Sequence, residues 1–552
     1  MTGPLLTLLN APTLAAYTTA GYWGTETLYG IAARHARATP DRFAVRDRHR
    51  RLTYAALVDA ADRLAGHLSA QGLRPGQRVA VWLPSRVETA IALLACSRNG
   101  YVCCPSLHRS HTVAQVAELV DRVRAAAMIA QPGYGADGDR NNIFDILADR
   151  AFLRWSCRIG PAAGPPFADA LGNATAPPPS SDPNQIMYLP FTSGTTGAPK
   201  GVLHSDNTLL ATARVMARDW RLEGAVLYTL SPLSHNLGLG ALVTALAGGG
   251  ELVIHDIGRG ESLVDRLEET GAAFLFGVPT HAIDLLAEMR ARGLTRLGQV
   301  RGFRISGAAA PAQLVADLID HGVTPQSGYG MTETCSHQYT RPDDPPDRII
   351  ATSGRACDGY ELRIWRQDDP DLEAAAGEIG EIGGRGASLM LGYFDDQAAT
   401  EAAFNAAGWF MTGDLGQLDE AGYLRITGRK KDVIIRGGHN IHAAPIEAAA
   451  QRHGGIAQAA AFPVPDPRLG ERVCLAVVPA SGVTPDAGRI LDHLAGEGVS
   501  TSDLPEFILC LTEMPLTPSG KIVKRELMRW VAEGKVRPHP ARFRPPAFAG
   551  ES

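Results

Sequence analysis

Long uninterrupted apolar runs, paired cysteine motifs and an early basic cluster are all missing from this chain of 552 residues. Its longest apolar stretch, Leu237–Ile254, is broken by a glycine triplet and Glu251, so we expect a buried helix and strand there and no membrane span. The eight cysteines form no C-x-x-C pair, and a chain of this length needs no disulfide framework. No Lys or Arg precedes Arg34, unlike in a secretory signal. These absences predict a cytoplasmic protein with reduced thiols.

An excess of either charge is also missing. The chain has 53 basic and 58 acidic residues, which leaves a formal net charge of −5. A protein whose main partner is a nucleic-acid polymer carries a basic excess, so we expect no nucleic-acid partner. A single nucleotide needs only a few local donors, so a nucleotide ligand remains possible. The length exceeds what one hydrophobic core fills, so two or more domains are expected.

One group of residues suggests a metal site. Cys103, Cys104, His108 and His111 lie close together in the sequence. Their spacing fits none of the common zinc patterns. Buried cysteines near a helix start are the plainer interpretation, and we predict no metal there.

The pattern from Thr53 to Gly428 alternates between short apolar runs and helical periods. After a Thr53 cap, apolar residues recur at helical spacing, at Leu57, Ala61, Leu64 and Leu68. Buried strands are expected at residues 78–83, 226–231, 251–255, 273–277 and 301–306. This alternation favours an α/β fold with mainly parallel sheets flanked by helices on both faces.

The character of the chain changes after Gly428. A charged turn, Arg429–Asp432, precedes a new set of short strands and helices. We therefore predict a large N-terminal domain of residues 1–428 and a smaller α+β domain after it. The Pro-, Ala- and Ser-rich segment 160–183 reads as an exposed connector inside the large domain.

The most informative run extends from Tyr188 to Gly201. An apolar lead-in is followed by hydroxyl side chains and glycines, and a single lysine, Lys200, stands near its end. The hydroxyl and backbone donors suited to an anion belong to Thr192, Ser193, Gly194, Thr195, Thr196 and Gly197. Such a loop can hold a polyphosphate. It is not the G-x-x-x-x-G-K-[ST] loop, because Pro199 precedes the lysine and Gly201 follows it.

The string Thr192–Gly201 resembles the signature loop of the adenylate-forming superfamily, which includes acyl-CoA synthetases, adenylation domains of peptide synthetases and beetle luciferases. Further motifs of that family follow in the right order and cover roughly residues 53–527. The resemblance implies a small-molecule carboxylic acid, ATP and coenzyme A as substrates, with Mg²⁺ as the cofactor. It also implies a hinge at 429–433, with Lys431 at the hinge position, and a small mobile C-terminal domain of residues 434–552.

Two motifs of the large domain match the family's nucleotide site. Tyr329–Thr334 resembles the second signature, in which Thr332 contacts the α-phosphate, Glu333 helps hold Mg²⁺ and Tyr329 stacks on adenine. A hydroxyl donor suits phosphate oxygen, and a carboxylate suits a hard cation. Gly307 and Ala308 resemble the small-residue segment that lets adenine and the acyl group lie against the backbone.

The ribose contacts follow from two later matches. By resemblance, Asp414 in Trp409–Leu415 accepts from both ribose hydroxyls, because an ionised carboxylate accepts and never donates. Arg429 matches a second ribose contact. Read alone, both residues would be charges in solvated turns.

The last motif, Pro518–Lys524, resembles the segment that carries the family's catalytic lysine. Lys521 would bridge the substrate carboxylate and the α-phosphate and compensate the negative charge that they bring together. Gly437 and Gly438 would line the channel of the thiol, where glycines allow a close approach of the backbone.

The acid-binding segment is matched by Ser231–Gly238. His235 stands beside the substrate carboxylate in this match, and a structural histidine is the alternative. No Asp is present there to pair with an ammonium group, so we expect an apolar acid. The predicted pocket wall consists of Leu237, Leu239, Phe276, Val278, Ala308 and Ala309. Its small residues leave room for a ring, and 191–210 resembles cyclohexanecarboxylate- and benzoate-type CoA ligases.

Several alternatives stay open at this point. The acyl acceptor can be a separate acyl carrier protein, the second step can be oxidative as in luciferases, or the chain can be an inactive nucleotide-binding regulator. A homodimer is among the possible assemblies. Ala443 and Pro445 stand where relatives often have Pro and Glu, whereas Glu447 is retained.

Overall fold

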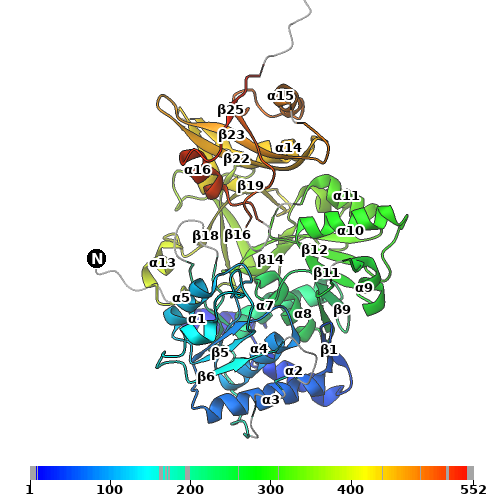
Figure 1. Ribbon diagram of the computed structural model, residues 1–552, viewed down its shortest axis with the longest axis vertical. Helices are drawn as coiled ribbons and strands as arrows, with labels where there is room; N and C mark the ends of the chain where they lie inside the picture. The colour runs from blue at the N-terminus through cyan, green and yellow to red at the C-terminus, as the bar shows by residue number, and fades with distance from the viewer. Residues whose placement is uncertain are drawn as a thin grey trace, which may run out of the picture. The chain divides into compact units, whose positions relative to one another are not determined.

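A computed structural model describes residues 8, 10–160, 166–167, 171, 174–192, 199–258, 260–308, 310–437, 439–484, 486–516 and 521–543. The fold is α/β, as the sequence predicts (Figure 1). The chain forms two compact units. The first unit comprises residues 1–362 and 384–410, and the second comprises 363–383 and 411–552. No helix in the described ranges is long and apolar enough to cross a membrane.

The earliest sheet in the chain has six strands, in the order β6-β5-β3-β4-β7-β8. Its pairings are parallel except for that of β7 with β8. The strands are β3 (Arg78–Trp82), β4 (Val102–Cys104), β5 (Ala127–Ala130), β6 (Trp155–Arg158), β7 (Ile186–Tyr188) and β8 (His204–Ser205).

A nine-stranded sheet follows, in the order β15-β14-β13-β12-β11-β9-β10-β1-β2. The run from β13 through β10 to β1 is parallel, and the strands at the two edges are antiparallel. Its strands are β1 (Phe43–Arg46), β2 (Arg51–Thr53), β9 (Val226–Thr229), β10 (Glu251–Ile254), β11 (Phe274–Gly277), β12 (Gly302–Ile305), β13 (Thr324–Met331), β14 (Cys335–Tyr339) and β15 (Arg355–Ala356). All five strands that the sequence predicts are therefore confirmed.

The first unit also contains the helices, most of which cover the two sheets. They are α1 (Ala11–Thr19), α2 (Leu28–Ala38), α3 (Tyr54–Ala70), α4 (Val87–Asn99), α5 (Val113–Val123), α6 (Ile143–Ile146), α7 (Asp206–Asp219), α8 (Asn236–Ala247), α9 (Leu263–Thr270), α10 (Pro279–Ala291), α11 (Ala312–Asp320), α12 (Pro346–Ala351) and α13 (Gln397–Ala402). Thr53 caps α3, as predicted, by accepting a hydrogen bond from the backbone N–H of Ala56 at 3.2 Å.

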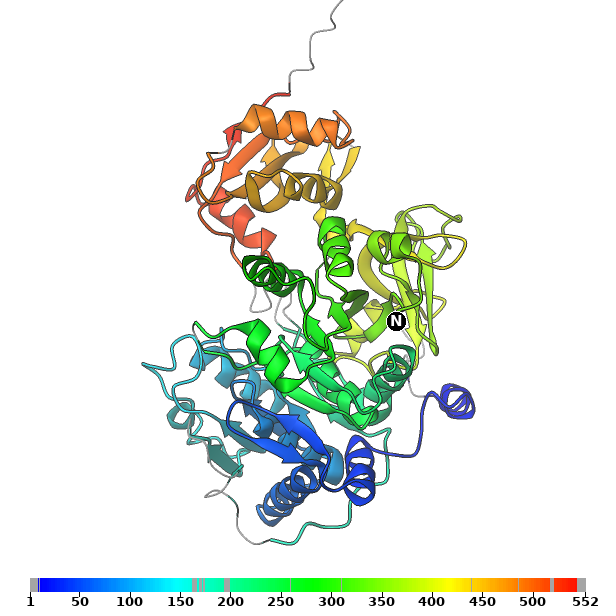
Figure 2. The same ribbon diagram turned by 90° about the vertical axis from the view of Figure 1, so that its right-hand side faces the viewer.

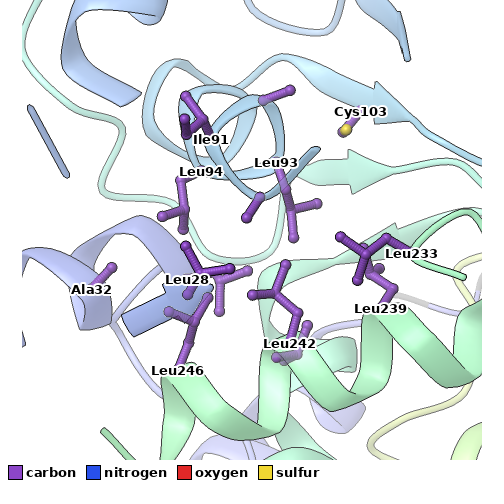
Figure 3. Close-up of a cluster of buried hydrophobic side chains, with 14 of the residues drawn as sticks. Leu28, Ala32, Ile91, Leu93, Leu94, Cys103, Leu233, Leu239, Leu242 and Leu246 are labelled. Carbon is purple, nitrogen blue, oxygen red and sulfur yellow. The ribbon is translucent and has the colours of Figure 1, made fainter. Parts of the chain in front are cut away.

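The main core fixes the position of α8. Every residue of α4 is buried, and Figure 3 shows Leu93 of α4 facing Leu242 of α8, with Leu28 of α2 between Leu94 and Leu246. Burying a leucine side chain contributes roughly 1.5–3 kcal/mol. Because this contact anchors α8, the residues at the helix start hold a defined position.

The second unit contains a six-stranded sheet with helices on both faces (Figure 2). Helices α14 and α15 share one hydrophobic cluster with the sheet, and α16 packs in another. A four-stranded sheet, β16-β17-β18-β19, contains the strands through which the chain passes between the units. These elements are β16 (Tyr360–Trp365), β17 (Gly380–Gly386), β18 (Phe410–Leu418), β19 (Leu424–Arg429), β20 (Val433–Arg436), β21 (His439–His442), α14 (Ala443–Gln451), β22 (Ile456–Asp466), β23 (Gly470–Pro479), α15 (Ala487–Gly496), β24 (Phe507–Cys510), α16 (Lys524–Ala532) and β25 (His539–Pro540).

The predicted boundary after Gly428 falls inside the second unit, where the turn Lys430–Asp432 is a short 3₁₀ helix. The hinge at 429–433 stays a prediction.

Candidate functional site

Five of the expected site residues lie at the carboxyl ends of strands in the nine-stranded sheet. His235 follows β9, Gly307 follows β12, and Tyr329, Thr332 and Glu333 lie at or just after the end of β13. These strands run parallel within one sheet. Since ligands of open α/β sheets bind outside the carboxyl ends of the strands, the structure brings these residues to the edge that favours binding. Gly307 has a φ of +91°, in the region that favours glycine, and Ala308 beside it is exposed.

Glu333 is buried and held from several sides. Its side chain accepts a hydrogen bond from the Tyr393 hydroxyl at 2.9 Å, and its backbone carbonyl accepts one from Met390 N–H at 2.7 Å. Burial, with Glu333 adding to it, raises the pKa of Tyr393, so this phenol keeps its proton at neutral pH and donates. The Lys200 ammonium lies 4.5 Å from the centre of the same ring. Tyr393 thereby connects the lysine of the phosphate loop with the acidic residue of the second signature.

The carbonyl of Thr332 is fixed by a buried histidine. His204 Nε2 lies 2.7 Å from this oxygen and must carry the proton, because a carbonyl only accepts. Burial lowers the pKa of His204 to about 4, so the imidazole is neutral and its tautomer is determined. Sequence analysis missed both residues, because Tyr393 lies outside every motif string and nothing in 191–210 shows that His204 meets the carbonyl of Thr332, 128 residues along the chain.

The two ends of the phosphate loop meet. Thr192 N–H donates to the carbonyl of Lys200 at 2.9 Å, and Phe191 pairs with Gly201 in an antiparallel bridge. The expected contacts Ser193, Gly194, Thr195 and Thr196 lie outside the described residues, as does Ala309 of the predicted wall.

His235 begins α8 and stacks on a second histidine. The rings of His108 and His235 lie 4.9 Å apart at 23°, and His108 Nδ1 lies 3.0 Å from the hydroxyl oxygen of Ser234. Burial, with His235 and His111 adding to it, lowers the pKa of His108 to about 3. A neutral, fixed His108 therefore orients the ring of His235.

The group suspected of metal binding does not assemble. Cys103 and Cys104 are neighbours in β4, so their side chains point to opposite faces of the sheet. They belong to different hydrophobic clusters. Burial and the neighbouring cysteines raise the pKa of both thiols, so neither is a ready thiolate ligand.

A cavity of about 20 Å³, room for about one water molecule, lies between α7, α8 and β14. Of the predicted apolar wall, Leu239 lines it, whereas Phe276 is buried within β11. Met216, Gly240, Val243 and Cys335 also line it. Sequence analysis missed Met216 and Cys335 because they lie on α7 and β14, far from α8 in the chain.

The two expected ribose contacts lie together in the second unit. Asp414 on β18 and Arg429 on β19 are cross-strand partners, with Arg429 Nε 3.0 Å from Asp414 Oδ1. Asp414 is only 7% exposed. Lys430 beside them pairs with Glu381 at 2.8 Å. The arrangement presents a fixed carboxylate with an adjacent guanidinium, which suits a vicinal diol.

The retained Glu447 joins three segments of the second unit. It lies 2.8 Å from Lys524 Nζ and accepts from Ala461 N–H at 2.7 Å, and Lys524 is also 3.4 Å from Asp432. Lys521 lies three residues before Lys524 and is partly buried. Burial, with Arg429 adding to it, lowers the pKa of Lys431.

The thiol-channel glycines are described in part. Gly437 N–H donates to the carbonyl of Leu469 at 2.7 Å, and its φ of +59° is one that glycine adopts freely. Gly438 and residues 517–520 lie outside the described residues.

Comparison with known proteins gives two family matches. Residues 32–394 match the AMP-binding enzyme family, and residues 445–521 match the AMP-binding enzyme C-terminal domain. The chain is 32% identical to the medium-chain fatty-acid–CoA ligase of Escherichia coli over 94% of each protein. It is 32% identical to the salicyl-AMP ligase / salicyl-S-ArCP synthetase of Mycobacterium tuberculosis, over 93% of this chain and 92% of that protein.

A solved structure shows the same architecture. ATP-bound MatB from Rhodopseudomonas palustris superposes with a TM-score of 0.81 at 26% identity, covering 91% of this chain and 99% of MatB.

Proposed function

Because this chain belongs to the AMP-binding enzyme family of the adenylate-forming superfamily, we propose that it activates a carboxylic acid whose body is apolar, cyclic or aromatic, as an acyl-adenylate. The enzyme is an acid–thiol ligase, and it uses ATP, Mg²⁺ and coenzyme A. The first step joins a carboxylate oxygen of the acid to the α-phosphorus of ATP and releases pyrophosphate. In the second, the thiol sulfur attacks the acyl carbon and AMP leaves.

The observation that carries this proposal is the contact of Tyr393 with both Lys200 and Glu333. A carboxylate that is 6% exposed is costly unless a cation or donors compensate it. Glu333 therefore fits a divalent cation, and Mg²⁺ prefers carboxylate and phosphate oxygens. When bound, the ion would neutralise charge on the phosphates. Lys200 and the hydroxyl of Thr332 would hold phosphate oxygens at the same edge.

The remaining nucleotide contacts are proposed on the same basis. Asp414 would accept from the two ribose hydroxyls, and Arg429 would support it. Tyr329 would stack on adenine beside Gly307 and Ala308. The cross-strand pairing of Asp414 with Arg429 supports the ribose assignment.

Lys521 would carry the electrostatic part of the first step. The attacking carboxylate and the α-phosphate are both anions, and a positioned cation lowers the energy of the state in which they meet. Residues 429–433, with Lys431, would form the hinge on which residues 434–552 turn between the two steps. Gly437 and Gly438 would then line the path of the thiol.

The acid-binding assignments rest on α8. His235 at its start would lie beside the reacting carboxylate, oriented by His108. Leu239 and Val243 supply an apolar lining. Some relatives are named for aromatic acids, among them an indoleacetate–CoA ligase and the salicyl-AMP ligase, which supports a ring-bearing acid here.

A carrier protein is the second candidate for the acyl acceptor, because the salicyl-AMP ligase relative is also named a salicyl-S-ArCP synthetase. A cytoplasmic location is proposed because all eight cysteines are free thiols, seven of them buried.

The proposal is tested by AMP release with ATP and Mg²⁺ over a panel of cyclic and aromatic acids, with and without coenzyme A. We expect AMP and the matching acyl-CoA to form in equal amounts. Pyrophosphate release without acyl-CoA would indicate that a carrier protein, and not coenzyme A, is the acyl acceptor. Failure with every acid would favour the inactive regulator.

A further inference from the structure

Arg304 lies in the middle of β12 and is fully buried. Its register partners are Phe276 on β11 and Gln326 on β13, so the three side chains share one face of the sheet. Its guanidinium lies over Gly328, where the Cβ of any larger residue would come within 2.7 Å of it. The absence of a side chain at Gly328 therefore makes room for the guanidinium.

No carboxylate pairs with this guanidinium among the described residues. Nη1 donates to Gln326 Oε1 at 2.6 Å, whereas Nε and Nη2 have no hydrogen-bond partner. Burial lowers the pKa of Arg304 to about 10, which leaves it charged at neutral pH. The two other arginines that are buried in the described part of the chain differ: Arg86 pairs with Glu88 at 2.9 Å and Arg98 with Asp62 at 2.6 Å.

The two unpartnered nitrogens form a specific recognition edge. Nε and Nη2 together make the two parallel hydrogen bonds of a bidentate contact with a carboxylate. Elsewhere in this chain Arg51 uses the same two atoms to bind Glu251, at 2.8 and 2.7 Å. A buried charge with that edge unused is costly unless an anion meets it.

One side chain, Met216, links the guanidinium with the cavity between α7, α8 and β14. The Met216 sulfur lies 3.9 Å from Arg304 Nη1, and Met216 also lines the cavity. Its flexible side chain can rotate to let a ligand pass. Cys335 lines the cavity from β14, and two residues along the same face His337 is fully buried with no hydrogen-bond partner at either ring nitrogen. Two cavity-lining residues, Met216 and Cys335, thus connect the cavity with buried residues that retain unpartnered nitrogens, Arg304 and His337.

We propose that the acid carries a second acidic group, a carboxylate or a sulfonate, at the end remote from the reacting carboxylate, and that Arg304 binds it. This inference rests on the proposed function and names its substrate class more closely. Leu239 and Val243 contact the apolar body of the acid, Met216 moves aside, and the Nε–Nη2 edge receives the distal anion. The expectation of a purely apolar acid came from the absence of an Asp near His235, which excludes an ammonium group but not an anion.

The test compares matched acids that differ only in the distal group. The pairs are benzoate with terephthalate, cyclohexanecarboxylate with cyclohexane-1,4-dicarboxylate, and heptanoate with pimelate. Wild-type kcat/KM from AMP release should favour the diacid at least about tenfold in one pair or more. In Arg304→Met the diacid value should fall about 100-fold, as when one partner of a buried charge pair is removed, while that of the monoacid changes less than about threefold. Arg304→Lys keeps the positive charge but lacks the Nε–Nη2 pair of donors, so its kcat/KM for the diacid should lie between those of the wild type and Arg304→Met.

Two controls separate recognition from folding. Arg301 is exposed just before the same strand and donates to the carbonyl of Trp220 at 3.1 Å, so Arg301→Met should keep the diacid preference. The favoured diacid should raise the Tm of nucleotide-free wild type but not that of Arg304→Met. A wild-type preference for the monoacid in every pair would overturn the inference and leave the ligase assignment standing. Equal losses for both acids in Arg304→Met would show a structural role only and overturn it as well. AMP release with no acid of either series would refute the proposed function, and the inference with it.

Discussion

The nucleotide region and the acid cavity of this protein are built in different ways. The candidate nucleotide contacts stand in short strings, such as Tyr329–Thr334, in which neighbouring residues serve one ligand. The cavity is lined from α7, α8 and β14, and the unpaired Arg304 lies on β12. Phosphates and ribose are the same in every reaction of this type, so one local string can serve them. An acid varies in shape, and only residues brought together by the fold can enclose it. Changes in the strings should therefore alter catalysis with every acid, whereas changes in the cavity should alter the choice of acid.

The largest effect is expected for Lys521→Ala. Loss of the cation should reduce adenylation on the order of 10²–10³-fold or more, whatever the acid, and leave thioester formation from a supplied acyl-adenylate nearly intact. Rapid-quench measurement of the two half-reactions distinguishes them. The control is Lys535→Ala, which removes an exposed lysine paired with Glu533 in the same unit. Equal loss in both half-reactions would contradict the role given to Lys521.

Tyr393→Phe should give the next largest effect. It removes the donor to Glu333 at 2.9 Å but keeps the ring beside Lys200. A hydrogen bond to a charged group is worth about 1.5–3 kcal/mol, so kcat/KM for ATP should fall about 10–100-fold and the Mg²⁺ requirement should rise. The KM of the acid, titrated at saturating ATP, should stay within about twofold. A change in the KM of the acid alone would place Tyr393 in the acid-binding region and contradict its role at the nucleotide.

Gly240→Leu should change kcat/KM for the acid and leave kcat/KM for ATP unchanged. A Cβ at Gly240 meets no atom within 4 Å, and the residue lines the cavity. Replacing a helix-interior glycine removes a cost of about 0.5–1 kcal/mol, but a leucine side chain exceeds a cavity of about 20 Å³ and overpacking costs about 1–3 kcal/mol, so the Tm should hold or fall slightly. The added side chain should reduce kcat/KM for ring acids about tenfold, an effect of the size expected for one to two methylene groups. An unchanged acid profile would show that this cavity does not receive the acid.

The smallest effect concerns stability and pH. Burial raises the pKa of Asp206 from 3.8 to about 7. The folded state therefore holds a proton that the unfolded state releases, so the contribution of Asp206 to stability is complete below pH 4 and is lost as the pH rises to about 7. This shift of about three units corresponds to roughly 4 kcal/mol at most. Asp206→Asn keeps the acceptor for Leu28 N–H and Ser97, so its Tm should vary less between pH 5 and 8. Parallel Tm profiles of the two proteins would contradict this.

Much of the fold was predictable because its signals are local. Leu57, Ala61, Leu64 and Leu68 show the helical period of α3, and short apolar runs mark β9 to β12. The motif strings also pointed to Asp414 and Arg429 as neighbours in one site, and the structure pairs them across two strands.

Other features depend on the fold and have no local signal. Tyr393 meets Glu333 across 60 residues, and Met216 and Cys335 line one cavity only because α7 packs on β14. Arg304 did have a signal, a charged residue in the middle of a buried strand, but only the structure shows that it lacks a carboxylate.

The most direct measurement is acid-dependent ATP–pyrophosphate exchange with labelled pyrophosphate, ATP and Mg²⁺, and no thiol. It isolates adenylation, on which every assignment above depends. The account predicts exchange that requires both the acid and Mg²⁺, and that Lys521→Ala largely loses. Binding of ATP without exchange, for monoacids and diacids alike, would contradict the account and make the protein a nucleotide-binding regulator.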